Sequence, residues 1–278
     1  MPFQPPSGLK AALHAGETKF GMWVNSSSVQ VAEISALAGF DFLVADLEHG
    51  HFVDVASAAE IVRAGAIAQV PVIVRVPGLQ ADTIGAVLDQ GALGICVPHI
   101  RNAEEAAQAV AYARYAPDGV RAMSPFVRAA GYSYEAWDTY WREANDEVLV
   151  IALIEDLVGV ENVDEIAGVP GIDVIWVGPG DLSQDAGVPF QLDHPIVAEA
   201  VAKGLAGAKR HGRIAMMTTA QSPTLDEEAR SAQLRDFVEQ GYRMITWPDM
   251  TTYAAAASEL LRVARDAAMP RPAGRAAG

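Results

Sequence analysis

Short apolar runs alternate with longer amphipathic stretches along the whole chain, and this alternation restricts the fold more than any other feature. Each run has the length and continuity of a strand buried on both faces, and a helical pattern follows it. Eight such units match an α/β protein with a (β/α)8 TIM barrel better than a doubly wound open sheet. The predicted strands are residues 20–25, 42–46, 71–76, 94–98, 148–155, 174–177, 213–218 and 243–247.

The domain organisation follows from the same pattern. No linker interrupts the repeat, so we expect one barrel domain over residues 1–278, with frayed tails at about 1–8 and 269–278. A final helix is predicted over residues 252–268. Residues 116–145 are too long for a plain loop, and we expect them to lie over the rim and shape a site. Ser124 in this segment is a candidate substrate-binding residue.

Composition excludes several classes of function. The net charge of -15 argues against a nucleic-acid partner, which would need clustered Lys and Arg. Cys96 is the single cysteine, so a disulfide framework cannot form within one chain. The N-terminal residues lack the pattern of a signal peptide, and no stretch is apolar enough to span a bilayer. We expect a cytoplasmic enzyme with no membrane partner.

Two carboxylates stand where predicted strands end. Glu155 closes the apolar run VIALIE, and Asp181 lies in the turn GPGDLS that follows the next strand. In a barrel these strand ends share one rim, where two carboxylates offer oxygen ligands to a divalent cation. The alternative is structural: Glu155 starts a helix and Asp181 caps the helix that begins at Leu182.

Other polar strand ends supply candidate acid, base and electrophile groups. Asp46 precedes His49 by three residues on one rim loop, a spacing that lets a carboxylate orient an imidazole and raise its basicity. Arg75 follows an apolar strand, where an unpaired guanidinium would be costly. Its anion is therefore a structural carboxylate such as Asp89, a substrate, or both at once.

The positions of the lysines bear on the chemistry. The chain has only four lysines, Lys10, Lys19, Lys203 and Lys209, and none stands at the C-terminal end of a predicted strand. Schiff-base catalysis needs a desolvated lysine in the site, so covalent imine chemistry is not expected. A metal ion would then have to polarise the substrate.

Several motifs in a fixed order resemble the HpcH/HpaI aldolase family of metal-dependent pyruvate aldolases, over about residues 19–264. The resemblance implies the barrel of the phosphoenolpyruvate/pyruvate superfamily, with a last helix used in oligomer contacts. As a set these motifs are highly specific, although each alone is weak. They are FDFLVADLEH (40–49), VIVRVP (72–77), GALGICVP (91–98), RYAPDGVR (114–121), IE (154–155), VENVDEI (160–166) and GPGDLS (178–183).

The resemblance also implies roles for individual residues. Glu155 and Asp181 would bind the metal, and His49 paired with Asp46 would form the acid/base unit. Arg75 would face the oxo group of the substrate. The backbone amides around Gly180 and Asp181 would hold the substrate carboxylate, as the start of a helix favours.

The implied activity is reversible cleavage of a 4-hydroxy-2-oxo acid to pyruvate, or a close 2-oxo acid such as hydroxypyruvate, and an aldehyde. Mg²⁺ or Mn²⁺ suits an oxygen-only site, and Co²⁺ or Zn²⁺ could substitute. The partners would be these small molecules and further copies of the chain, in a hexamer built from three dimers. Residues 126–141 and the alanine-rich last helix also carry more apolar surface than one rim needs.

Three features depart from the family pattern, and rival functions remain. Leu153 replaces a glutamine common in the family, and residues 222–230 and 246–249 differ from its usual pattern. One rival is a citrate-lyase-β-like lyase that acts on a coenzyme A thioester, although the acidic chain shows no basic nucleotide pocket. A pyruvate-kinase-like phosphoryl transferase would need phosphate-binding lysines or a Gly-rich loop. The third is a non-catalytic ligand-binding barrel.

Overall fold

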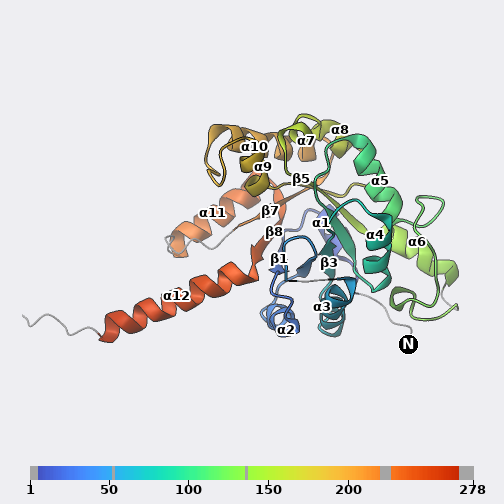
Figure 1. Ribbon diagram of the computed structural model, residues 1–278, viewed down its shortest axis with the longest axis horizontal. Helices are drawn as coiled ribbons and strands as arrows, with labels where there is room; N and C mark the ends of the chain where they lie inside the picture. The colour runs from blue at the N-terminus through green and yellow to red at the C-terminus, as the bar shows by residue number, and fades with distance from the viewer. Residues whose placement is uncertain (1–5, 52–53, 135–136, 220–226, 269–278) are drawn as a thin grey trace, which may run out of the picture.

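A closed barrel of eight parallel strands forms the centre of the molecule (Figure 1). The structure is a computed structural model that describes residues 6–51, 54–134, 137–219 and 227–268. Every predicted strand is present within a few residues of its expected bounds, so the predicted (β/α)8 fold is confirmed. The strands are β1 Lys19–Val24, β2 Phe42–Asp46, β3 Val72–Arg75, β4 Gly94–Val97, β5 Leu149–Ile154, β6 Val174–Val177, β7 Ile214–Thr218 and β8 Tyr242–Pro248.

Helices surround the barrel, and side-chain caps begin several of them. The side chain of Asn102, for example, accepts a hydrogen bond from the backbone N–H of Glu105 at 2.9 Å. The helices are α1 Leu9–His14, α2 Val29–Leu37, α3 Val55–Ile67, α4 Ala81–Asp89, α5 Ala103–Ala113, α6 Trp137–Glu147, α7 Leu157–Glu161, α8 Val163–Gly168, α9 Pro179–Asp185, α10 Pro195–Arg210, α11 Glu227–Gln240 and α12 Asp249–Ala268, with a 3-10 turn at Arg128–Ala130.

Strand side chains alternate between two apolar clusters, one inside the barrel and one under the helices. The inner cluster includes Trp23, Cys96 and Trp176. Leu153 belongs to it and is fully buried. The residue that departs from the family pattern therefore fills the barrel interior, two residues below Glu155 on the same face of β5.

The first helix, α1, has no counterpart among the predicted elements. Leu9 and Leu13 pack into the inner cluster at the end of the barrel where the strands begin. The Nζ of Lys10 lies 3.0 Å from the carbonyl oxygen of Val148 and 3.0 Å from Oδ1 of Asp173. These contacts close the N-terminal end of the barrel.

Residues 116–134, the described first part of the long excursion before α6, lie at that same N-terminal end. Nη2 of Arg121 donates to Oδ1 of Asp89 at 2.6 Å, and Nη1 of Arg128 donates to the carbonyl of Gln90 at 2.9 Å. The two acceptors, Asp89 and Gln90, lie at the C-terminal end of α4. Because the helices of this barrel run antiparallel to the strands, that end of α4 lies at the N-terminal end of the barrel. The expectation that residues 116–145 cover the rim of their own barrel is therefore wrong for the described residues 116–134.

The last helix, α12, begins at Asp249 rather than Thr252 and points away from the barrel (Figure 1). The Asp249 carboxylate accepts the backbone N–H groups of Asn25 and Ser26, each at 3.1 Å, and so fixes the first turn. All residues from Ala256 to the end of the helix whose side chains the structure describes are exposed. In the described part of the chain, no helix has the length and apolarity needed to cross a bilayer.

Candidate active site

An ion pair joins the ends of β2 and β3 on the C-terminal rim. These strands pair with Asp46 opposite Arg75. Nε and Nη2 of Arg75 donate to the two carboxylate oxygens of Asp46 at 2.8 and 2.6 Å, and the guanidinium carbon lies 4.9 Å from the ring centroid of Trp23. The structural anion of Arg75 is thus Asp46. The suggested partner Asp89 is wrong, because Asp89 pairs with Arg121.

Asp46 is fully buried and surrounded by donors. Besides Arg75, it accepts Nδ2 of Asn25 at 2.7 Å and the backbone N–H groups of Glu48 and His49 at 3.1 and 3.2 Å. Burial alone would raise the pKa of Asp46, but the ion pair and the amide donors outweigh it and hold the pKa below its usual value. Asp46 therefore stays ionised near neutral pH.

The relation between Asp46 and His49 differs from the expected one. Among the described residues, Asp46 meets His49 through the backbone amide, and the imidazole forms no hydrogen bond to this carboxylate. The contact fixes the loop that carries His49.

Glu48 belongs to the site, although sequence reasoning did not select it. Its Oε2 lies 3.2 Å from Nη1 of Arg75, is buried, and has no hydrogen bond within the described chain. Burial raises the pKa of Glu48 above its usual value despite the opposing effect of Arg75. Its position between Asp46 and His49 in the sequence was the available signal.

Glu48, His99 and Glu155 form a cluster across three strand ends. Nε2 of His99 lies 3.3 Å from Oε1 of Glu48, and Nδ1 lies 3.3 Å from Oε2 of Glu155. The backbone N–H of His99 also donates to Oε2 of Glu155 at 3.3 Å. One ligand atom from each residue can be chosen so that all lie within 4.8 Å of one another. This spacing suits a metal ion.

The electrostatics of Glu155 also favour a bound cation. Burial, and then the charge of Glu48 and that of Asp181, raise its pKa to about 8, while Arg75 and the His99 amide lower it. Several carboxylates thus converge on one buried point with too little positive charge to balance them. A divalent cation would supply that charge, so the residues fit a metal ion.

The turn after β6 carries the other predicted ligand. Asp181 lies in the first turn of α9 and is exposed; it is outside the three-residue cluster, but its charge reaches Glu155. Gly178 lies directly against Glu155, because a Cβ there would stand 3.1 Å from Cγ and 3.2 Å from Oε1 of that residue. Gly180 is in the same turn, with open space beside it.

Ser124 is the one predicted site residue that the structure does not bring to this rim. It accepts the backbone N–H of Phe126 at 3.3 Å, within the segment at the N-terminal end of the barrel. Any contact with substrate would have to be made in the site of a neighbouring subunit. The remaining predicted residues, Asp46, His49, Arg75, Glu155, Gly180 and Asp181, all lie at or just after the C-terminal ends of strands.

In this chain an arginine and several carboxylates converge at the C-terminal rim of a parallel (β/α)8 barrel. This is the arrangement of a TIM-barrel enzyme, whose active site lies at that rim. The family model for HpcH/HpaI aldolase/citrate lyase matches residues 19–247. The chain belongs to this family. The predicted family and the predicted class of aldolase-type lyase are thereby confirmed.

Individual relatives agree with this assignment. The chain is 36% identical over 208 residues to a hydroxypyruvate/pyruvate aldolase of Sagittula stellata, covering 75% of this chain and 81% of the relative. It is also 36% identical to a 5-keto-4-deoxy-D-glucarate aldolase of Klebsiella pneumoniae, covering 75% and 80% of the two chains. A solved HpcH/HpaI family protein from Burkholderia cenocepacia superimposes with a TM-score of 0.84 at 34% identity, over 92% of this chain and 98% of that one.

Proposed function

We propose that this protein is a metal-dependent 2-oxo acid aldolase. It reversibly cleaves a 4-hydroxy-2-oxo acid to an aldehyde and pyruvate or hydroxypyruvate, the acids in the name of the Sagittula relative. The observation that carries the proposal is the buried Glu155, with its raised pKa, beside Glu48 and the guanidinium of Arg75. Such a site can bind a cation and an anionic substrate together.

Glu155 and Asp181 are the proposed metal ligands, with Glu48 and His99 next to them. Mg²⁺ or Mn²⁺ is the expected ion, and Co²⁺ or Zn²⁺ could replace it. When bound, the cation would polarise the 2-oxo group and stabilise negative charge on it. The backbone amides around Gly180 and Asp181 are the proposed contacts of the substrate carboxylate.

Arg75 and His49 have separate roles in the proposed cleavage reaction. Arg75 faces the negative charge that develops on the substrate oxygen as the C3–C4 bond breaks, and Asp46 holds its guanidinium in place through two hydrogen bonds. His49 removes the proton of the C4 hydroxyl, so that the aldehyde can leave, and the enolate that remains is then protonated at C3 to give the 2-oxo acid. Asp46 thus acts as a positioning residue for Arg75 and for the loop of His49.

Turnover with pyruvate and a panel of aldehydes tests this proposal. Chelation should abolish activity, added Mg²⁺ or Mn²⁺ should restore it, and borohydride with pyruvate should leave the enzyme active. None of the four lysines follows a strand of the barrel, so a lysine labelled by pyruvate would refute the mechanism. Absence of aldol addition between pyruvate and every aldehyde would leave the non-catalytic barrel as the better explanation.

Proton exchange separates the two roles. His49→Ala should slow cleavage by roughly 10²- to 10⁴-fold, the range for loss of a general base, and affect exchange of the pyruvate methyl protons less. Arg75→Ala should depress both processes, and Arg75→Lys should rescue poorly because a point charge cannot replace the guanidinium fork. If His49→Ala lost cleavage and exchange equally while Arg75→Ala kept exchange, the roles of base and electrophile would have to be reversed.

A coenzyme A thioester lyase is the less supported alternative. The relatives with 36% identity are named for free 2-oxo acid substrates. A turnover assay with citryl and malyl thioesters distinguishes the two activities directly.

We also place the enzyme in the cytoplasm, because the single Cys96 is fully buried and a reducing compartment suits a chain without disulfides.

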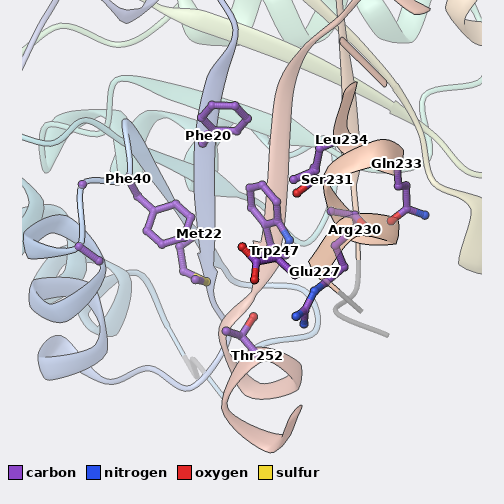
Figure 2. Close-up of a pocket in the computed structure, with 13 residues that line it drawn as sticks. Phe20, Met22, Phe40, Glu227, Arg230, Ser231, Gln233, Leu234, Trp247 and Thr252 are labelled. Atoms are coloured by element: carbon purple, nitrogen blue, oxygen red, sulfur yellow. The ribbon is translucent and has the colours of Figure 1, made fainter. Parts of the chain in front are cut away.

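We propose further that the protein assembles into a homo-oligomer through α12. In a (β/α)8 barrel, the helix after β8 would cover the seam between β8 and β1. Here a cavity of about 500 Å³ lies over that seam, lined by Phe20, Phe40 and Trp247 (Figure 2). None of the residues that line it belongs to the rim cluster, so this cavity is distinct from the candidate active site.

The occupant of this groove would be α12 of a second copy. The helix carries one apolar stripe at helical spacing, and Tyr253 and Leu260 on it are 74% and 73% exposed. Each copy thus has both an uncovered groove and an unpartnered helix, which allows a reciprocal exchange between two copies. A hexamer of three such dimers would agree with the expectation from the family.

Light scattering at micromolar concentration tests the assembly. Leu260→Glu should lower the mass, because it places a charge in the stripe, whereas Ser258→Glu on the same helix lies outside the stripe and should not. A wild-type monomer with full activity would refute the proposal.

A further inference from the structure

His99 stands at a position of the rim where the backbone is unusual. It follows β4 directly, and its φ of 57° places it in the left-handed region, which a residue with a Cβ adopts at some cost. This conformation turns the imidazole toward β2 and β5, where its two ring nitrogens lie 3.3 Å from carboxylates on each side. The strained backbone therefore serves a defined side-chain position.

The carboxylates on either side of the imidazole are deeply buried. The side chains of Glu155 and Glu48 are 3% and 10% exposed, while that of His99 is 53% exposed. Oε2 of Glu48 is buried without a hydrogen bond in the described chain, although it faces the guanidinium of Arg75. The cluster thus has a buried acidic floor, and His99 covers it from the solvent side.

The spacing of the cluster suits direct coordination. Adjacent ligands of an octahedral ion stand about 3 Å apart when each lies about 2.1 Å from it. The two contacts of 3.3 Å between ring nitrogen and carboxylate oxygen are close to that separation. A neutral imidazole offers one nitrogen to a metal, and its other N–H donates to a neighbouring carboxylate.

We propose that His99 is a nitrogen ligand of the metal ion and makes this a mixed nitrogen and oxygen site. This inference rests on the proposed metal-dependent function and adds one ligand to it. The consequence is a preference among metals. Imidazole nitrogen suits Co²⁺ and Zn²⁺ better than Mg²⁺, which prefers oxygen. His99 thereby sets which cation this chain takes.

Metal binding can be measured without turnover. Pulsed electron paramagnetic resonance of the Mn²⁺-loaded protein should show nitrogen modulation from a coordinated imidazole. His99→Asn should remove that modulation, and Asn is chosen because it tolerates the left-handed backbone. Calorimetry of His99→Asn should show Co²⁺ affinity reduced at least about tenfold, with a smaller reduction for Mg²⁺. Tenfold is the lower end of the loss seen when a residue that only hydrogen-bonds a metal ligand is removed, and loss of a ligand itself should cost at least as much.

His211→Gln is the matched control. Nε2 of His211 also lies near a carboxylate, 3.4 Å from Asp164, but far from the rim and outside the three-residue cluster. This variant should keep the nitrogen modulation and the order of metal affinities. Thermal unfolding of both variants, compared with wild type, shows whether the fold is intact.

The outcomes separate this inference from the proposed function. Mn²⁺ bound at the site without nitrogen modulation in the wild type, or with modulation unchanged in His99→Asn, would overturn the role of His99 and leave a metal-dependent aldolase. No divalent cation bound at all would overturn both. Loss of modulation in His99→Asn alone, with Mn²⁺ still bound, supports the inference.

Discussion

The raised pKa of Glu155 makes metal binding depend steeply on pH. Its pKa of about 8 means that most copies of the metal-free protein carry a proton there at pH 7, and a cation must displace it. The ionised fraction falls from about one half at pH 8 to about one hundredth at pH 6, so the apparent affinity should fall about 50-fold. Each ion bound at pH 7 should release about 0.9 proton from this group.

The raised pKa of Glu155 also makes the stability of the metal-free protein depend on pH. A carboxyl whose pKa is about 8 in the folded protein, against 4.5 for the ordinary group, binds more protons folded than unfolded between these values. The metal-free protein should therefore lose stability as pH rises from about 4.5 to about 8. Bound metal should remove this loss, because it favours the ionised form.

Calorimetry in buffers of different ionisation enthalpy counts the released protons, and carboxyl NMR of the metal-free protein reports the titration itself. Glu155→Gln should remove the resonance that titrates near pH 8, together with the proton release. Glu199→Gln, at an exposed position on α10, should change neither. An affinity that differs less than about fivefold between pH 6 and pH 8 would refute the reasoning.

Three further substitutions have expected outcomes. Asp46→Ala should cost about 3–5 kcal/mol in urea unfolding, because the buried Arg75 loses the partner of two of its hydrogen bonds and keeps only the longer contact with Glu48. Gly178→Ala should weaken metal binding in calorimetry by displacing the glutamate that follows β5, whereas Gly85→Ala, with open space around it, should leave affinity unchanged; equal effects would contradict this. Asp173→Ala should lower the thermal midpoint, since it removes the acceptor of a buried β5 amide and of the α1 lysine, and an unchanged midpoint would show that these contacts add little.

The barrel could be predicted from sequence because its determinants are local. Each apolar run is long enough for one strand and too short for a helix, and capping residues such as Asn102 mark where helices begin. Strand ends of a parallel barrel necessarily share a rim. The candidates Asp46, Arg75 and Glu155 therefore came together without any knowledge of their distances.

Features that depend on contacts distant in sequence could not be predicted in the same way. Residues 116–134 are held at the N-terminal end of the barrel by contacts such as that of Arg121 with Asp89, and no local pattern encodes them. The partner of Asp46 is Arg75, which is 29 residues away, rather than the nearby His49 imidazole. The short α1 lacked a pattern long enough to be recognised.

The closure of the barrel by α1 determines how molecules reach the rim. Leu9 and Leu13 seal one end, and large side chains such as Trp23 and Trp176 fill the interior. Reactants and products must then share a single mouth at the C-terminal end. If the 2-oxo acid binds beside the buried Glu155, as proposed, it has to arrive before the aldehyde and depart after it. The proposed site and the closed barrel together predict an ordered catalytic cycle.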